Sequence, residues 1–384
     1  MQENHSLLSV GIDIGTTTTQ VIFSHLKLTD VARPGQIPRM MITDREIVFQ
    51  SDPFFTPLLD KDTIDSVKLK SMIDKVYEAA RVSPGQIETG AVIITGETAK
   101  KKNADEILNS LAGFAGDFVV SVAGPHVESL IAGRGSGACQ YSQSHFNTVL
   151  NIDIGGGSAN IAAFRSGNFL SSAAMNFGGR ILIIDKNSGK VLHIAEPAKI
   201  IVDEYNLKIS IGQLPELTEI IKFCDVLSKL TIELIEGTVS DISKKLYLTE
   251  PISISGKNSV IMISGGIGYY YHHPVKINSI SDMAIHDDIG PLLAQSLLNN
   301  PELNKYNIIC PAETLRATVL GASTQTVTLS GSTIWAEKDI LPLKNVPVVR
   351  PEISHENAFE NLAADIVLSV KKWDLDAQND IYAI

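Results

Sequence analysis

The stretch that decides the fold is VGIDIGTTTTQVIF, residues 10–23, in which an aspartate stands inside an apolar run just before a turn of glycine and threonine. A degenerate copy, LNIDIGGGSANIAAF, occupies residues 150–164 and places Asp153 where the first copy has Asp13. Alternating apolar residues on both sides of turn-forming residues predict a strand, a tight turn and a second strand in each copy. Two such hairpins far apart in one chain indicate a duplicated unit.

The sequence around the hairpins predicts helices that alternate with strands. Residues 69–80 carry apolar side chains at helical spacing, and residues 215–237 form a long, mostly apolar helical stretch. This alternation is typical of a layered α/β fold. We expect a first lobe at residues 1–145 and a second lobe at residues 146–384, divided near the glycine-rich stretch 133–137.

Composition excludes several classes of protein. The chain has 384 residues with 44% hydrophobic content, which is enough for two or three domains with buried cores. A net charge of −11 argues against a nucleic-acid partner. No apolar run is long enough to span a membrane, so we expect a cytoplasmic protein. Three scattered cysteines show no metal or disulfide pattern, and we expect them to be reduced and buried. The apolar last residues predict that the sequence stops short of a natural C-terminus.

Asp13 and Asp153 are candidate metal ligands. Each lies between two isoleucines on an apolar strand, where an unpaired carboxylate would cost several kcal/mol. Mg²⁺ takes oxygen ligands and is commonly bound by one or two carboxylates together with substrate phosphates. The two aspartates therefore predict a magnesium-bound triphosphate, with Asp13 and Asp153 at the metal.

The two turns are candidate phosphate-binding segments. Successive backbone N–H groups can converge on an anion, and glycine lets a phosphate approach the backbone closely. The residues that we expect to bind the nucleotide in this way are Gly15, Thr16, Thr17, Thr18, Gly155, Gly156, Gly157 and Ser158.

A third segment completes a known order of motifs. An apolar strand at residues 260–264 runs into Gly265, Gly266 and Gly268. The two hairpins followed by this segment resemble the two phosphate motifs and the adenosine motif of the actin/Hsp70/hexokinase superfamily, and residues 97–111 and 312–323 resemble its connecting helices. The resemblance implies an actin-like ATPase, ribonuclease H-like, duplicated two-lobe fold with an interlobe nucleotide cleft. It also implies that the three glycines let adenine and ribose lie against the backbone.

Within that superfamily the chain resembles the EutA family of reactivating factors for ethanolamine ammonia-lyase. The resemblance is carried by residues 9–23, 123–138 and 311–322 and by the second hairpin, and it extends over essentially the whole chain. It implies a chaperone-like protein of ethanolamine utilisation that uses ATP and Mg²⁺. Such a factor releases damaged cobalamin from the adenosylcobalamin-dependent lyase so that intact cofactor can bind. The lyase is then the protein partner, and association with a bacterial microcompartment and formation of a homo-oligomer both stay open.

Hydrolysis also needs a group that orients water. Glu97, which follows an apolar strand, and Glu128, which lies in a segment similar to one of exopolyphosphatases, are the candidates alongside Asp13 and Asp153. The alternative for each glutamate is a solvated helix carboxylate.

Three other functions fit the same motifs. A small-molecule kinase would use the same phosphate clamp, a nucleotide-binding module would change shape without hydrolysis, and an exopolyphosphatase would cleave polyphosphate. We expect Mg-dependent ATPase activity coupled to reactivation.

Overall fold

The computed structural model describes residues 5–15, 18–30, 40–60, 63–95, 103–111, 119–122, 124–254, 256–323, 349, 362–373, 375 and 382. The chain forms two compact units, one of Met1–Gly124 with Val319–Ile384 and one of Pro125–Thr318. The sequence placed the division after residue 145. Packing instead groups residues 125–145 with the second unit and residues from 319 onward with the first.

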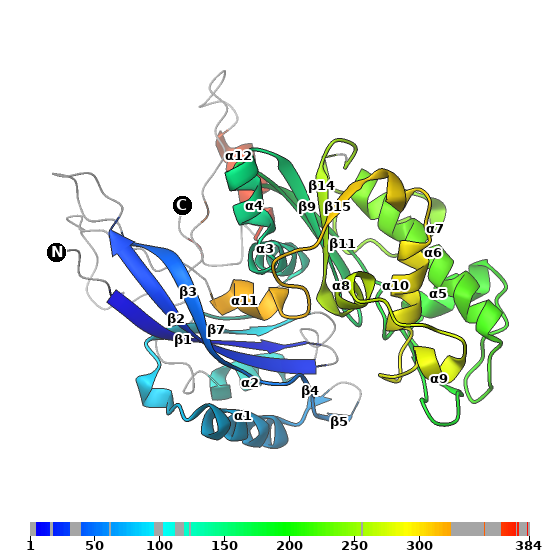
Figure 1. Ribbon diagram of the computed structural model, residues 1–384, viewed down its shortest axis with the longest axis horizontal. Helices are drawn as coiled ribbons and strands as arrows, with labels where there is room; N and C mark the ends of the chain where they lie inside the picture. Colours follow the sequence, from blue (N-terminus) through cyan, green and yellow to red (C-terminus); the bar gives the residue numbers. More distant parts are fainter. Residues whose placement is uncertain are drawn as a thin grey trace. The chain divides into compact units, whose positions relative to one another are not determined.

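The first unit is built on a six-stranded sheet (Figure 1). Its elements are β1 (His5–Ile14), β2 (Thr18–Asp30), β3 (Met40–Gln50), β4 (Phe54–Phe55), β5 (Leu58–Asp60), β6 (Thr63–Ile64), α1 (Ser66–Ala80), β7 (Thr89–Ile94), α2 (Ala104–Leu111), β8 (Val119–Val122) and α12 (Leu362–Lys371). The strand order is β3-β2-β1-β7-β8, and β4 pairs with β2. Strands β1, β2 and β3 are antiparallel, whereas β7 and β8 run parallel to β1.

The second unit repeats this arrangement. Its elements are α3 (Pro125–Gly135), α4 (Ala138–His145), β9 (Thr148–Ile154), β10 (Ala159–Arg165), β11 (Asn168–Met175), β12 (Leu182–Ile184), β13 (Val191–Ile194), α5 (Glu196–Glu204), α6 (Leu217–Glu236), α7 (Asp241–Lys244), β14 (Val260–Ser264), α8 (Gly265–His272), α9 (Ile280–Met283), α10 (Gly290–Leu298) and β15 (Asn307–Ile309); α11 (Ala317–Ser323) begins at its end. The strand order β11-β10-β9-β14-β15 has three antiparallel strands followed by two parallel ones. This is the ribonuclease H-like arrangement of actin-like ATPases, and its occurrence in both units confirms the predicted duplicated fold.

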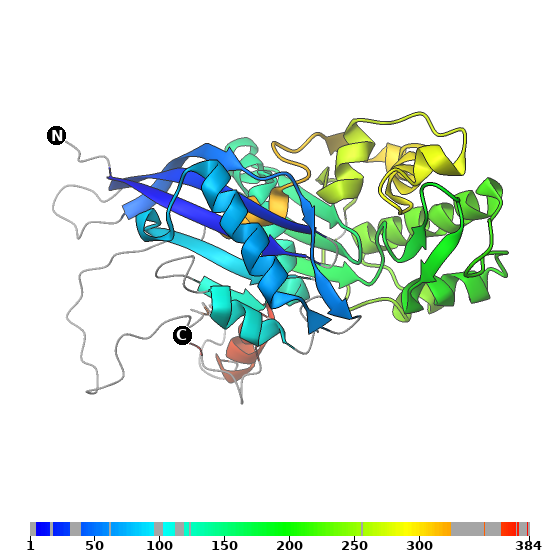
Figure 2. The same ribbon diagram turned by 90° about the horizontal axis from the view of Figure 1, so that it is seen from below.

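The two faces of the first sheet carry different side chains, because side chains alternate along a strand, and each face packs against a different helix. Val10, Ile12 and Ile14 of β1 pack with Leu69 and Ile73 of α1. Helix α1 lies along this face, as Figure 2 shows. It begins at the N-cap Asp65, whose carboxylate accepts from the Lys68 N–H at 2.9 Å. On the opposite face Ile22 packs with Val319 and Leu320 of α11.

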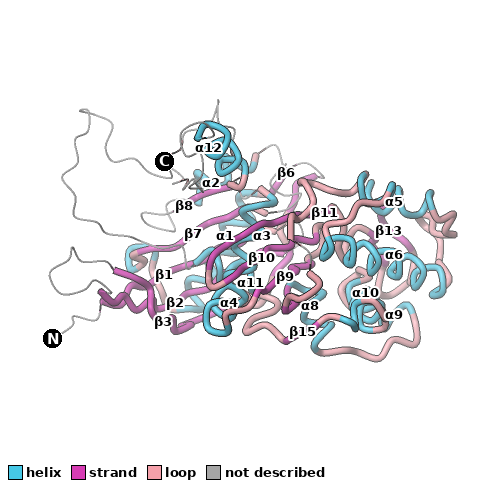
Figure 3. The backbone as a smooth tube through the Cα atoms, turned by 90° about the horizontal axis from the view of Figure 1, so that it is seen from above, coloured by secondary structure: helices cyan, strands magenta, loops and turns pink. Residues whose placement is uncertain are grey.

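The second sheet has the same two-faced construction. Ile152 and Ile154 of β9 share a core with Phe223 of α6 and Leu293 of α10. Helices α5, α6, α9 and α10 gather on this side (Figure 3). The other face is covered by α3, where a Cβ on Gly133 would come within 2.4 Å of the Phe164 ring. Glycine is needed at that point for α3 to lie against β10, which explains why residues 125–145 pack with the second unit.

The second predicted connecting helix is shorter than expected. The helix predicted over residues 312–323 begins at Ala317. The first residues of the predicted range are not helical, because their backbone groups bond elsewhere. The Ala312 N–H donates to the Ser136 carbonyl, and the Thr314 carbonyl accepts from the Gly265 N–H, both at 2.9 Å. Helix α2 begins at Ala104, and residues 97–102 of the first predicted helix lie outside the described residues.

Candidate functional site

The first predicted hairpin is present as β1 and β2, which pair antiparallel along their length. The Gly15 N–H donates to the Thr18 carbonyl at 3.0 Å and closes the turn. Thr16 and Thr17 lie outside the described residues. Asp13 directly precedes the turn and is partly buried. The strand–turn–strand prediction is therefore confirmed for this copy.

Two threonines outside the repeat contact this hairpin. The Thr95 hydroxyl donates to Asp13 Oδ1 at 3.0 Å. The Thr56 hydroxyl donates to the Gly15 carbonyl at 2.9 Å and lies 3.0 Å from the Thr19 hydroxyl. Sequence reasoning missed both threonines, because only sheet pairing brings them to the turn.

The second hairpin, β9 with β10, has the same closure. The Gly155 N–H donates to the Ser158 carbonyl at 3.1 Å. A Cβ on Gly155 would meet no atom within 4 Å, so the space beside this residue is open. The turn therefore combines backbone N–H groups with room for a ligand, as an anion-binding segment requires.

A loop that the sequence analysis did not single out supports this turn from behind. The Gly179 N–H donates to the Gly155 carbonyl at 3.0 Å, and the Arg180 N–H donates to the Gly156 carbonyl at 2.7 Å. A Cβ on Gly178 would lie 2.5 Å from the Gly155 oxygen. The pair of glycines after β11 was the available signal, since only glycine permits two backbones to lie this close.

Asp153 is the more deeply buried of the two aspartates, with 6% of its surface exposed. Desolvation raises the pKa of its carboxyl from 3.8 to about 6, although hydrogen bonds from Ser264 and Thr318 act in the opposite direction. The Ser264 hydroxyl donates to Asp153 Oδ1 at 2.7 Å and accepts from Asn151 Nδ2 at 2.9 Å. The carboxylate is therefore oriented by a hydrogen-bond chain that crosses two strands.

The predicted adenosine segment is a strand exit into α8, but its glycines differ in purpose. A Cβ on Gly265 would lie 2.4 Å from the Ile154 carbonyl oxygen, and one on Gly268 would lie 2.5 Å from that of Ile263. Gly266 has no atom within 4 Å of its Cβ position. Two of the glycines are thus required for packing within the chain, and Gly266 is the one with open space.

Of the two candidate glutamates, Glu97 lies outside the described residues, and Glu128 lies in the first turn of α3. Glu128 is 9% exposed, so its interpretation as a solvated helix carboxylate is wrong. The same turn is tied to β11 by a 2.8 Å hydrogen bond between His126 Nδ1 and the Ser172 hydroxyl. Ser172 shares a sheet face with Asp153, because residues directly opposite across β9, β10 and β11 share a face. Helix α3, which carries Glu128, therefore covers the face that carries Asp153.

The residues beside each aspartate are suited to a hydrated hard cation. Gln20 is directly opposite Asp13, and Asn160 is directly opposite Asp153. In the described part of the chain the side-chain oxygens of Gln20 and Asn160 are buried without a hydrogen-bond partner. The described residues contain no cluster of three or more His, Cys, Asp or Glu that could bind a metal by itself. Magnesium bound by one or two carboxylates, phosphates and water fits this donor set.

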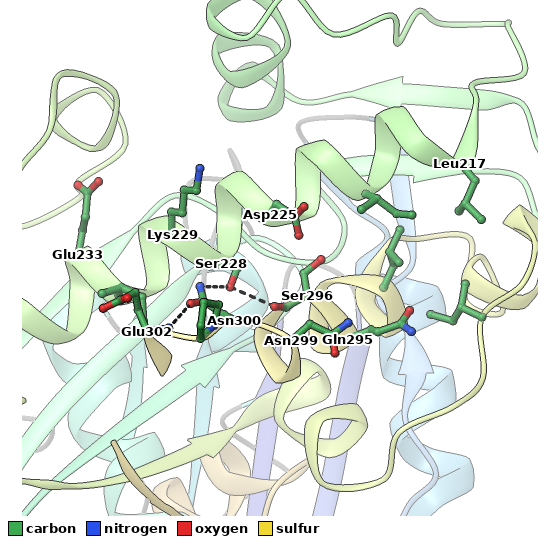
Figure 4. Close-up of a pocket in the computed structure, with 15 residues that line it drawn as sticks. Leu217, Asp225, Ser228, Lys229, Glu233, Gln295, Ser296, Asn299, Asn300 and Glu302 are labelled. Atoms are coloured by element: carbon green, nitrogen blue, oxygen red, sulfur yellow. Dashed lines mark hydrogen bonds between the residues drawn. The ribbon is translucent and has the colours of Figure 1, made fainter. Parts of the chain in front are cut away.

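A groove of about 770 Å³ lies elsewhere in the second unit, between α6 and α10 (Figure 4). The side chain of Asn300 donates to the Ser228 hydroxyl at 2.7 Å, and this hydroxyl donates to the Ser296 carbonyl at 3.4 Å. The lining residues are Leu217, Ile221, Asp225, Ser228, Lys229, Ile232, Glu233, Ile277, Leu292, Gln295, Ser296, Asn299, Asn300, Pro301 and Glu302. The predicted site residues that the structure describes do not line this groove.

The cysteines and helices bear on two further expectations. Cys224 is buried, Cys139 is partly buried and Cys310 is exposed, so the expectation that all three are buried is wrong for the last two. No helix among the described residues is long and apolar enough to cross a membrane.

Comparison with known proteins gives a match over nearly the whole chain. The family model described as "Ethanolamine utilisation protein EutA" matches residues 5–384. Two proteins named ethanolamine ammonia-lyase reactivase EutA, from Escherichia coli (strain K12) and Salmonella typhimurium (strain LT2), are each 41% identical to this chain over 380 residues. These alignments cover 98% of this chain and 79% of each relative.

Similarity to solved structures is weaker. A Ppx/GppA phosphatase from Aquifex aeolicus is 15% identical to this chain, with a TM-score of 0.47. The alignment covers 83% of this chain and 100% of the phosphatase chain. The ethanolamine utilization protein EutJ from Carboxydothermus hydrogenoformans is 13% identical to this chain, with a TM-score of 0.41. The alignment covers 83% of this chain and 89% of the EutJ chain. The fold assignment therefore depends on the strand order of the two sheets.

Proposed function

This chain belongs to the ethanolamine utilisation protein EutA family, and we propose that it is an ATP-dependent reactivating factor for ethanolamine ammonia-lyase. The observation that carries the proposal is the 41% identity to two reactivases along 98% of the chain. The two glycine-bearing turns, each preceded by an aspartate, supply the nucleotide site that such a factor needs.

In this proposal each of the two turns binds phosphate groups of ATP. Gly15 and Gly155 begin the two turns and close them by donating to the Thr18 and Ser158 carbonyls, so the N–H groups that follow are the ones proposed to contact phosphate. Gly266 offers open space for the adenosine moiety. Asp13 and Asp153 are the residues that would hold Mg²⁺, which would supply charge neutralisation at the phosphates. The other proposed phosphate contacts are Thr16, Thr17, Thr18, Gly156, Gly157 and Ser158, with Gly265 and Gly268 supporting the adenosine segment.

Phosphoryl transfer to water depends mainly on positioning and on charge stabilisation. Glu128 is the group that we assign to orient the attacking water, because it is a buried carboxylate on the helix that covers the sheet face with Asp153. Glu97, three residues after β7 in the sequence, is the alternative. A magnesium-dependent ATPase activity is therefore part of the proposal.

Reactivation requires the nucleotide to change how the protein binds its partner. A ligand shifts a conformational equilibrium only by its difference in affinity for the two states. The partner is the lyase. ATP turnover would change how this protein binds the lyase, and this change would weaken the binding of damaged cobalamin in the lyase's own cofactor site. No cobalamin-binding role is assigned to this chain.

The test is recovery of a blocked lyase. Ethanolamine ammonia-lyase inactivated with hydroxocobalamin is mixed with this protein, Mg-ATP and fresh adenosylcobalamin, and ethanolamine deamination is followed. We expect recovery with the wild-type protein and none with Asp153→Asn. Absence of recovery, or equal recovery without ATP, contradicts the proposal.

The same preparations distinguish the other functions. ADP release that requires a sugar or small acid indicates a kinase. Phosphate release from polyphosphate indicates an exopolyphosphatase. Tight Mg-ATP binding without ADP release indicates a module that changes shape on binding alone.

A further inference from the structure

In each sheet, a hydroxyl from the strand that runs parallel to the first strand of the hairpin, or from the residue just after it, donates to the hairpin's aspartate. Thr95, directly after β7, donates to Asp13 at 3.0 Å, and Ser264, the last residue of β14, donates to Asp153 at 2.7 Å. Strands β7 and β14 are the parallel neighbours of β1 and β9. The sequence repeat covers only the hairpins, so only the structure shows that both aspartates accept from a hydroxyl on this side.

The strand register explains why these hydroxyls reach the carboxylates. Ser264 is directly paired with Asp153. Asp13 is paired with Ile93, and Thr95 lies two residues farther along, which places its side chain on the same face. Both hydroxyl groups belong to residues that are at least nine-tenths buried, Thr95 being 4% exposed and Ser264 0%. Neither contact is an incidental surface encounter.

An independent observation indicates that a ligand belongs beside each pair. Gln20 and Asn160, opposite Asp13 and Asp153, are 9% and 2% exposed, and their side-chain oxygens have no hydrogen-bond partner among the described residues. A buried acceptor without a donor is unfavourable. Water bound to Mg²⁺ is a strong donor, and magnesium usually keeps several such waters.

We propose that Thr95 and Ser264 are positioning residues that fix the orientation of the two metal-binding aspartates, and that the amide oxygens of Gln20 and Asn160 accept hydrogen bonds from the metal's water. This inference rests on the proposed Mg-nucleotide site. Each aspartate is thus the centre of a set with one hydroxyl from the parallel neighbour and one amide from the antiparallel neighbour.

The Ser264 contact is fixed in direction. Asn151 Nδ2 is a donor, so Ser264 Oγ accepts from it and directs its own proton to Asp153. Ser264 also directly precedes Gly265 and Gly266, at the start of α8. A shift of the adenosine segment would therefore move the hydroxyl that aims the carboxylate.

The experiment compares Ser264→Ala with a matched control, Ser228→Ala. Ser228 is 1% exposed and also accepts from an asparagine amide, that of Asn300 at 2.7 Å, but lies in the groove between α6 and α10. Calorimetry measures the affinity of each protein for ADP with Mg²⁺ and with EDTA, and electron paramagnetic resonance measures Mn²⁺ binding in the presence of ADP.

We expect Ser264→Ala to weaken Mg-ADP and Mn²⁺ binding at least tenfold, as is typical when a group that orients a metal ligand is removed. Affinity for ADP in EDTA should change less than about twofold, and Ser264→Thr should restore metal-dependent binding. Ser228→Ala should bind like the wild type.

Equal losses in Ser264→Ala and Ser228→Ala, or wild-type metal affinity in Ser264→Ala, would overturn the positioning role. If Ser264→Ala does not fold, Thr95→Val removes the hydroxyl that donates to Asp13 at nearly constant volume and must show the same metal-dependent loss. If the wild-type protein itself binds no Mg-ADP, the proposed function fails instead, so the two failures are distinguishable.

Discussion

The burial of Asp153 gives the sharpest prediction for stability. Its carboxyl is 6% exposed, and burial raises its pKa from 3.8 to about 6 in the folded state. A group with a raised folded pKa contributes stability that is fully present below pH 4 and is lost as the pH rises through 6. A rise of this size corresponds to about 3 kcal/mol of unfolding free energy.

Asp153→Asn isolates this contribution, because asparagine is neutral and can still accept from Ser264. In metal-free protein with EDTA, the substitution should raise the unfolding free energy at pH 7 by about 3 kcal/mol relative to the wild type. At pH 4 the two proteins should have nearly equal stability. Other carboxylates titrate in both proteins, so the difference between them reports on this position.

The assay is urea denaturation followed by circular dichroism at several pH values between 4 and 7. Saturating Mg-ADP should then stabilise the wild type more than the asparagine variant, since ligand binding stabilises the folded state. A stability difference that does not change with pH would refute the reasoning that Asp153 is desolvated in the folded protein.

Two further predictions concern the first turn and the adenosine segment. Thr56→Val removes the donor to the Gly15 carbonyl and should cost about 1–3 kcal/mol of unfolding free energy, measured by thermal denaturation, together with weaker Mg-ATP binding; wild-type values for both would show that this contact is dispensable. Gly268→Ala places a Cβ 2.5 Å from the Ile263 carbonyl oxygen and should lower the unfolding free energy by about 1–3 kcal/mol. The Cβ of Gly266→Ala meets no atom within 4 Å, so this variant should leave the unfolding free energy unchanged or raise it by up to about 1 kcal/mol. Equal melting temperatures for these two alanine variants would contradict the difference in packing, and a selective loss of ADP affinity in Gly266→Ala would agree with its open space.

The features that the sequence predicted are those that depend on local patterns. The two hairpins follow from apolar alternation on both sides of glycine and threonine, and the duplicated fold follows from their recurrence. Gly265 was recognised because a strand runs directly into it. In each case neighbouring residues carry the signal.

The features that the sequence did not predict depend on pairing between distant strands. Thr95 and Ser264 reach their aspartates across 82 and 111 residues, so no local spacing marks them. Gly178 supports the second turn only because β11 ends beside it. The late start of α11 is likewise set by a long-range bond, that from the Ala312 N–H to the Ser136 carbonyl.

The central claim is that Mg-nucleotide binding depends on both acidic turns. Isothermal titration calorimetry of Mg-ADP into the wild type, Asp13→Asn and Asp153→Asn tests it directly. We predict one site per chain in the wild type and a loss of affinity of at least tenfold in each variant. Wild-type affinity in either variant would contradict the claim.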